Sequence, residues 1–279
     1  MQPEDFLQAQ QARLTDMLRP YQREVNRRQG VADFVNRCLR SASRDDFFQL
    51  YELLNSRTAR EVEAEPGWED AKGLFDQLRT DATQKVERYQ LRFLQDFTRS
   101  VEEAGLPLEN DFPRLRLLKG IELEVMFAKK QSLLNSRPLK TVDPRRLIRA
   151  VVALRRHLYD RPFDPRGFID GLYAVYQKVN RGAGRGDGDT APIQTVYMEY
   201  TLSLQSRSFF QDMAKGKFRG YDADQFAVDC WRYFSSDVAA TSDGHVLRLS
   251  PGRNNALWLI DASGERRRIS GLSFQRGEA

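Results

Sequence analysis

The spacing of the hydrophobic residues changes near residue 107, and this change constrains the fold more than any other feature of the sequence. Before it, hydrophobic residues recur every three or four positions, which is the spacing of amphipathic helices. After it, in residues 111–143, they partly alternate with polar residues, which favours β-strands. We therefore predict an α+β protein, mostly α, that begins with a helical module over residues 1–107.

The longest helical pattern covers residues 69–105 and reads EDAKGLFDQLRTDATQKVERYQLRFLQDFTRSVEEAG. Gly105 and Pro107 end it, because glycine is favoured just after a helix and proline cannot continue one. The candidate buried positions on this helix are Leu74, Leu78, Leu91, Leu94 and Phe97.

Residues 108–180 are predicted to form a β-hairpin followed by a pair of helices. Ile121, Leu123 and Val125 alternate with polar residues in the hairpin. Asp143 and Asp164 each precede a proline. Such an Asp-Pro pair favours a helix start, because aspartate caps the free N–H groups and proline fits the first turn.

A glycine-rich stretch, NRGAGRGDGDTAP, follows the second of these helices. It lacks the Gly-Lys-Ser/Thr of a Walker loop, the GxGxxG spacing of a dinucleotide-binding loop and the further oxygen ligands of an EF-hand. We interpret residues 181–192 as a flexible connector. The alternative is an Arg-Gly segment that touches a phosphate backbone.

Residues 193–279 are predicted to form a C-terminal module. Its first part, residues 193–213, is compatible with strand or helix, and a helix is predicted from Asp222 onward. Turn signals at Pro251-Gly252 and Ser263-Gly264 divide the tail into a small antiparallel β-meander. A helix followed by such strands suits a winged-helix-like end module.

Composition limits the possible classes of protein. Of the 279 residues, 41% are hydrophobic and 30% are charged, which is typical of a folded chain. No apolar run reaches the roughly 20 residues of a membrane span, the N-terminus carries no signal core, and Cys38 and Cys230 are expected to be buried free thiols. We therefore expect a cytoplasmic protein with no membrane contact, and the net charge of +5 favours polyanionic or acidic partners.

An arginine ridge is predicted on the helix after Asp143. At about 100° per residue, Arg145, Arg149 and Arg156 fall within roughly 40° of one another, and Arg146 lies near the edge of this stripe. Such a ridge could follow a phosphate backbone or meet an acidic protein. The alternative is a solvated face with ordinary ion pairs.

Two further basic clusters are weaker candidates for nucleic-acid binding. The run after the Ser263-Gly264 turn would lie on a hairpin strand, where charge can also serve to protect a sheet edge from aggregation. The cluster near the N-terminus lies on a predicted helix. The residues are Arg266, Arg267 and Arg268 in the first cluster and Arg23, Arg27 and Arg28 in the second.

Catalytic motifs are sparse in this sequence. His157 and His245 lack the neighbours of a metal site or a catalytic triad, so we predict no metal and no cofactor. The nearest approach to a metal-dependent nuclease is Glu122 and Glu124, which would share one face of a strand. The lysines that follow this pair are Lys129 and Lys130.

Three segments resemble accessory subunits that are encoded beside SMC-like or other ATPases and nucleases in prokaryotic genome-defence operons: DPRRLIRAVVALRRHLYDRPFDPRGFIDGLYAVY, VYMEYTLSLQSRSFF and YDADQFAVDCWRYF. The resemblance covers roughly residues 110–279. It implies a non-catalytic subunit that helps an ATPase or nuclease recognise foreign DNA, and it assigns no functional residue.

We therefore predict an adaptor that contacts double-stranded DNA and the protein subunits of a larger antiviral complex. The alternatives are a divergent metal-dependent nuclease that uses Glu122 and Glu124, and a purely structural scaffold.

Overall fold

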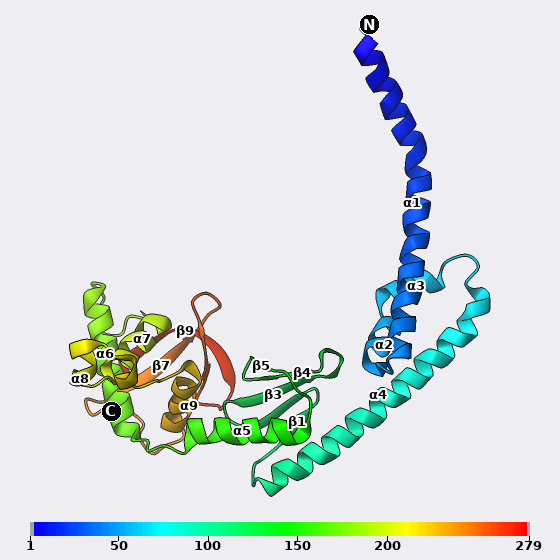
Figure 1. The fold of residues 1–279 in the computed structure, drawn as a ribbon. Coiled ribbons are helices and arrows are strands. Elements are labelled where there is room, and N and C mark those ends of the chain that lie inside the picture. Colours follow the sequence, from blue (N-terminus) through cyan, green and yellow to red (C-terminus); the bar gives the residue numbers. More distant parts are fainter. Residues whose placement is uncertain (1–2, 278–279) are drawn as a thin grey trace. The chain divides into compact units, whose positions relative to one another are not determined.

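The computed structural model describes residues 3–277 and divides the chain into two compact units (Figure 1). The first unit comprises the described residues up to 96 together with 127–129, and the second comprises 97–126 and the described residues from 130 onward. Helices account for 58% of the structure and strands for 16%. The predicted α+β class, mostly α, is therefore confirmed.

The first unit is built from helices, as the spacing of its hydrophobic residues predicts. They are α1 (Pro3–Ser43), α2 (Phe47–Leu54), α3 (Arg57–Glu63) and α4 (Glu69–Glu103), the last of which continues into the second unit. Side chains from all four helices form its core, among them Phe34, Leu54, Val62 and Phe75. The rings of Phe34 and Phe75 stack with their centroids 6.2 Å apart.

Two positions predicted to be buried on α4 are exposed instead. Leu74 and Leu91 expose 60% and 59% of their surface, whereas Phe97 is buried as expected. The reason is that α4 packs along a single face, and this face runs through Phe75 and Phe93 rather than through the leucines beside them. Apolar spacing located the helix but not the stripe that faces the core.

The first sheet of the second unit has five antiparallel strands, where the sequence predicts a hairpin. They are β1 (Glu109–Asp111), β2 (Arg114–Leu118), β3 (Ile121–Met126), β4 (Gln131–Leu134) and β5 (Arg137–Leu139), paired in that order. A short 3-10 helix, η1 (Phe127–Lys129), separates β3 from β4 and belongs to the first unit. The additional strands are joined by tight turns, one of which places Asn135 and Ser136 at φ of 49° and 67°.

The paired Asp-Pro sequences start two helices, as predicted. Helix α5 (Pro144–Tyr159) is capped by Asp143, whose side chain accepts a hydrogen bond from the Arg146 backbone N–H at 2.8 Å. Helix α6 (Pro165–Gly182) is capped in the same way by Asp164. The capped starts fix where both helices begin.

The rest of the second unit contains more helices and a second antiparallel sheet. The ambiguous segment after residue 192 is helical, and a helix follows Asp222 as predicted. The elements are β6 (Ala191–Pro192), α7 (Ile193–Ser203), α8 (Arg207–Asp212), η2 (Lys215–Lys217), α9 (Ala223–Phe234), β7 (His245–Pro251), β8 (Leu257–Ile260) and β9 (Arg266–Arg276).

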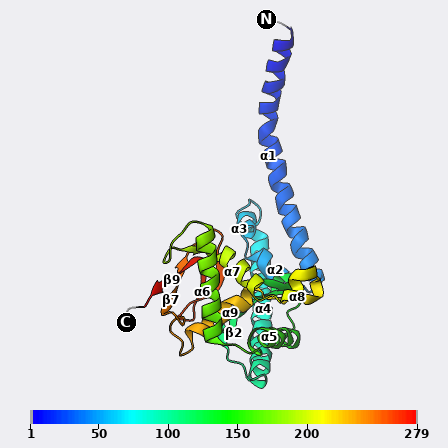
Figure 2. The ribbon, with the colours of Figure 1, turned by 90° about the vertical axis from the view of Figure 1, so that its left-hand side faces the viewer.

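The order of strands in the second sheet differs from a meander. Strand β9 pairs with β6, β7 and β8, whereas a meander would pair β7 with β8. The length of β9 allows this, because its first residues pair with β8 and its later residues with β7. Helix α6 lies across β9, where Tyr176 contacts Phe274 with ring centroids 5.2 Å apart (Figure 2). The winged-helix analogy stays a prediction.

The glycine-rich loop after α6 has a defined set of hydrogen bonds. Tyr176 donates its hydroxyl to the Asp189 carbonyl at 2.8 Å and accepts from the Gly188 N–H at 2.9 Å, and Asn180 also donates to the Asp189 carbonyl. The chain on both sides of the loop belongs to the second unit. The flexibility expected of residues 181–192 stays a prediction, and the loop's backbone is held by α6.

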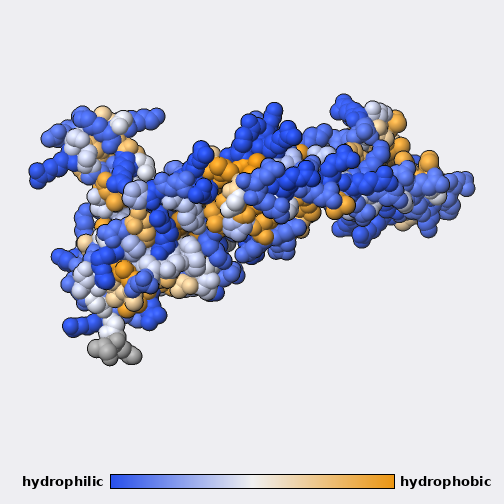
Figure 3. Space-filling view, turned by 90° about the horizontal axis from the view of Figure 1, so that it is seen from below, coloured by the Kyte–Doolittle hydropathy of each residue, from blue (hydrophilic) through white to orange (hydrophobic). Residues whose placement is uncertain are grey.

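The chain as a whole is hydrophilic, with a mean hydropathy of −0.61. On the face shown in Figure 3, hydrophilic residues predominate and hydrophobic side chains reach the surface in separate patches. Within residues 3–277, no helix combines the length and the apolar character needed to cross a membrane.

Candidate nucleic-acid interface

Helix α5 separates its residues into an apolar face and a basic face, as the sequence predicts. Leu147, Val151 and Leu158 are buried. The basic face consists of side chains that are all exposed: Arg145, Arg146, Arg149 and Arg156. The predicted ridge therefore points to solvent.

The four arginines of this face, which we call the α5 arginine surface, lack acidic partners. Among residues 3–277, no carboxylate lies within 4.0 Å of their guanidinium groups, whereas the neighbouring Arg155 pairs with Asp160 at 3.0 Å. Arg149 donates a hydrogen bond only to the backbone carbonyl of Arg145, at 3.2 Å. The alternative of ordinary ion pairs therefore fits Arg155 but not the ridge.

Both ends of α5 are held by the surrounding structure. Tyr159 at the C-terminal end donates a hydrogen bond to the Lys119 carbonyl at 2.5 Å. Burial raises the pKa of Tyr159 to about 12, so its hydroxyl keeps the proton that it donates. With Asp143 at the other end, the helix presents its arginines from a fixed position.

His157 contacts the start of α9. Its Nε2 lies 3.2 Å from Oδ2 of Asp222, the residue that caps α9. Asp222 also accepts from the Gln225 N–H at 2.9 Å and from Arg137 at 3.1 Å. Burial acts to raise the pKa of Asp222, but these hydrogen bonds together lower it below its usual value. The contact joins α5 to α9.

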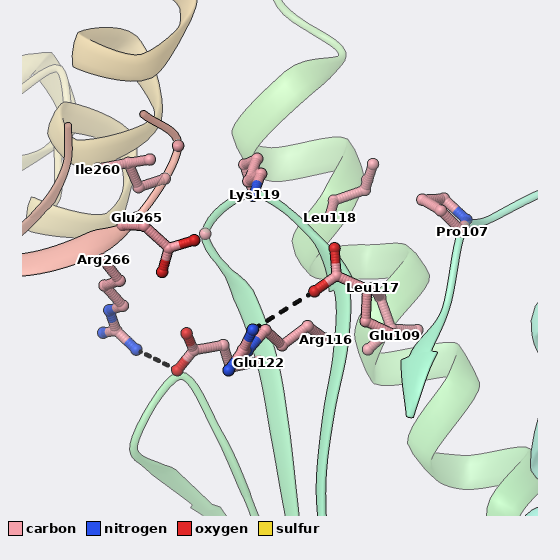
Figure 4. Close-up of a pocket in the computed structure, with 12 residues that line it drawn as sticks. Pro107, Glu109, Arg116, Leu117, Leu118, Lys119, Glu122, Ile260, Glu265 and Arg266 are labelled. Atoms are coloured by element: carbon pink, nitrogen blue, oxygen red, sulfur yellow. Dashed lines mark hydrogen bonds and ion pairs between the residues drawn. The ribbon is translucent and has the colours of Figure 1, made fainter. Parts of the chain in front are cut away.

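The arginines of the second predicted cluster, on β9, make ion pairs and ring contacts. Arg266 donates to Glu122 at 2.9 Å, as Figure 4 shows, and Arg267 pairs with Asp261 at 2.7 Å. Arg266 and Arg268 lie over the ring of Trp258, at 5.4 and 5.5 Å from its centroid. Only Arg268 of the three lacks a carboxylate partner among the described residues.

Trp258 is a candidate contact residue that sequence reasoning missed. Its side chain is 48% exposed although it is a tryptophan, and it lies directly opposite Arg268 across the β8–β9 pair. An exposed aromatic ring beside arginines is a common arrangement for stacking on nucleobases. The signal that could have found it is the hairpin register, which places Trp258 and Arg268 five residues from either side of the turn centre.

A cavity of about 280 Å³ lies between the turn that joins β2 to β3 and the turn that joins β8 to β9 (Figure 4). Its charged lining is largely paired: Arg266 contacts Glu122, and Arg116 contacts Glu109 at 3.4 Å. Glu124 lies 3.7 Å from Arg114. Glu122 and Glu124 therefore neutralise arginines that lie beside them, Arg266 and Arg114.

The carboxylates of the predicted nuclease alternative are not gathered into a cluster. Glu122 and Glu124 share one face of β3, as predicted. Lys129 lies in the first unit and the two glutamates in the second. Within the described part of the chain, no group of three or more His, Cys, Asp or Glu side chains is placed to hold a metal ion.

Within the second unit, α5 and Arg266 approach β3 from opposite faces. Helix α5 contacts β3, whose Ile121, Leu123 and Val125 are buried, whereas Arg266 pairs with Glu122 on the other face of that strand. In the first unit, Arg27 and Arg28 both pair with Glu24. The α5 arginine surface therefore stands as the strongest candidate.

Comparison with known proteins gives no family assignment: no family model, no curated protein and no solved structure matches the chain. The resemblance to accessory subunits of genome-defence systems stays a prediction.

Proposed function

We propose that this protein is a non-catalytic accessory subunit of a larger complex and that it binds the phosphate backbone of double-stranded DNA through α5. The observation that carries the proposal is the α5 arginine surface, four exposed guanidinium groups without acidic partners among the described residues. Unpaired arginines on a rigid helix suit phosphate, because the guanidinium group stays charged and donates in a planar fork.

Backbone contact explains the chemistry of this surface better than base readout does. The exposed face of α5 offers arginines and few other hydrogen-bonding side chains near them. Phosphate contacts fix the position of a protein on DNA without reading the sequence. We therefore expect binding with little sequence preference and a strong dependence on salt.

The non-catalytic, adaptor part of the proposal rests on how the reactive side chains are used. His157 is engaged with Asp222, and Glu122 with Arg266. Such a subunit would act with an ATPase or nuclease partner in the cytoplasm of a prokaryote, in defence against foreign DNA.

The proposal is tested by measuring the affinity for a labelled duplex of about 20 base pairs by fluorescence anisotropy at several salt concentrations. The test variant carries Arg145→Ala, Arg149→Ala and Arg156→Ala. Each phosphate contact contributes about 0.9 to the slope of log K against log salt, so the slope should fall by about 3. Equal affinity and slope for the variant and the wild type would refute the proposal, as would absence of binding at low salt.

A matched control separates a local effect from the loss of net charge. Arg60, Arg92 and Arg99 are exposed arginines on α3 and α4. Replacing these three by alanine removes the same charge while leaving α5 intact. We expect the control to keep most of the affinity and slope of the wild type, because it leaves the four guanidinium groups of the α5 arginine surface in place.

A further inference from the structure

The N-terminal half of α1 carries a hydrophobic stripe that is largely exposed. Among residues 4–30 no side chain is buried, and this part of α1 extends beyond α2, α3 and α4 (Figure 1). The stripe consists of side chains with exposed fractions between 58% and 72%: Leu7, Leu14, Leu18, Tyr21 and Val25.

The spacing of these residues is that of a coiled-coil seam. Leu7, Leu14 and Tyr21 are seven residues apart, and Leu18 and Val25 form a second series with the same spacing. In heptad terms the first series occupies d positions and the second occupies a positions. The seam therefore fits another helix rather than a flat or irregular surface.

A partner is also needed to explain why this part of the chain is a helix. Pro20 lies inside α1 and Gly30 follows it, and both residues disfavour a helix interior. A helix without tertiary packing is marginal in water. Packing along the stripe would supply the missing stabilisation.

We propose that the stripe binds the same stripe of a second copy of this chain, as an antiparallel two-stranded coiled coil centred between Leu14 and Leu18. In this register Leu14 faces Leu18 of the second copy, and Leu7 faces Val25. The next layers match as well: Gln11 faces Tyr21, and Glu4 faces Arg28.

Charge complementarity selects the second copy and its direction. Glu4 and Arg28 are the charged residues at a and d positions, and the antiparallel register brings them together at both ends of the coil. A parallel register would place Glu4 on Glu4 and Arg28 on Arg28, which is unfavourable. Arg28 now contacts Glu24 of its own helix at 2.8 Å with its side chain 78% exposed, so it is within reach of a partner.

The residues beside the seam also permit pairing of two identical helices. The flanking positions hold no like-charged pair in this register. Gln8 faces Gln22 of the second copy, and Thr15 and Met17 each face the same residue of the second copy. Glu24 flanks the seam, and the remaining charged residues and the proline lie on the outer face: Asp5, Arg13, Asp16, Arg19, Pro20, Arg23 and Arg27. The outer face is therefore the polar one.

The oligomeric state of the full chain tests the proposal by analytical ultracentrifugation at micromolar concentration. We expect a dimer, and dissociation to a monomer in a Leu14→Glu/Leu18→Glu variant, with affinity about 100-fold weaker because each chain would bury two charges without partners. Both leucines are exposed in the single chain, so this variant keeps its fold. Arg23→Glu, on the outer face, is the control and should leave the dimer intact.

Disulfide trapping tests the direction of the helices. In the antiparallel register a mixture of Leu14→Cys and Leu18→Cys chains forms a mixed disulfide, whereas either variant alone does not, because only opposite residues come within bonding distance. The native cysteines are buried and do not interfere. A disulfide between two Leu14→Cys chains would overturn the antiparallel arrangement.

A charge exchange gives an independent test of the register. Glu4→Arg or Arg28→Glu alone should weaken the dimer, and the two together should restore it, because each end of the coil regains an opposite pair. A chain that stays monomeric at tens of micromolar would overturn the proposal and assign the stripe to a different protein. A dimer that survives Leu14→Glu/Leu18→Glu would also overturn it.

Discussion

Tyr159 shows how one buried hydroxyl supports the proposed interface. It holds the end of α5 through its bond to the Lys119 carbonyl at 2.5 Å. We predict that Tyr159→Phe lowers the free energy of unfolding by about 1 kcal/mol at neutral pH, since an intramolecular hydrogen bond contributes about that much. Urea unfolding measures the change. An unchanged free energy of unfolding would show that this hydrogen bond does not anchor α5.

The same residue predicts a pH dependence with a definite sign. Burial raises the pKa of Tyr159 to about 12, whereas the pKa of an unfolded tyrosine is about 10. The stabilisation from the neutral hydroxyl is therefore complete below pH 10 and is lost as pH rises toward 12. The difference in unfolding free energy between wild type and Tyr159→Phe should shrink over this range. A difference that stays constant to pH 12 would contradict the prediction.

At the scale of elements, the start of α9 links three parts of the second unit. Asp222 caps α9 and accepts hydrogen bonds from Arg137 on β5 and His157 on α5. We predict that Asp222→Ala destabilises the protein by about 2 kcal/mol at pH 7, near the upper end for a lost cap, because two further contacts are lost with it. Asp143→Ala, which removes the α5 cap, is the control and should cost about 1 kcal/mol.

Acid should weaken the contribution of Asp222. Its pKa lies below its usual value in the folded protein, so its stabilisation is present above the unfolded pKa of about 3.9 and is lost as pH falls through the lower folded value. Unfolding in urea at pH 7 and pH 3 measures this. The gap between wild type and Asp222→Ala should be smaller at pH 3, and an equal gap would show that the carboxylate charge contributes nothing.

Sequence reasoning located the elements that depend on local signals. The starts of α5, α6 and α9 follow from Asp143, Asp164 and Asp222, because a cap acts on the backbone N–H groups that directly follow it. The order of the second sheet did not follow, since strand pairing joins residues far apart in the chain. Strand β9 is long enough to pair with several partners, and turn signals alone do not choose between them.

The candidate site could be predicted only in part for the same reason. The arginine stripe of α5 follows from helical geometry, which is local. The absence of acidic partners for Arg145 and Arg149 among the described residues, and the pairing of Arg266 with Glu122, depend on tertiary contacts. The position of Trp258 beside Arg268 depends on the register of the β8–β9 pair, which is also a tertiary feature.

At the scale of the whole chain, the two proposals lie in different units. The stripe of α1 belongs to the first unit and the α5 arginine surface to the second. We therefore predict that the Leu14→Glu/Leu18→Glu variant binds a short duplex as the wild type does when each duplex accommodates one chain. On a long duplex the dimeric wild type should bind more tightly, because its second surface binds at high effective concentration. Equal affinity of variant and wild type on long DNA would argue against this coupling.

Separate cores also predict separate unfolding transitions. Leu54 is 1% exposed in the core of the first unit, and Leu123 is fully buried in the second. Replacing either leucine by alanine should cost about 2–5 kcal/mol, the usual range for a buried leucine. In calorimetry we expect two transitions, with Leu54→Ala lowering the midpoint of one and Leu123→Ala lowering the midpoint of the other. Because α4 continues from the first unit into the second, a single transition that shifts equally with both variants would mean that this helix couples the two cores into one cooperative fold.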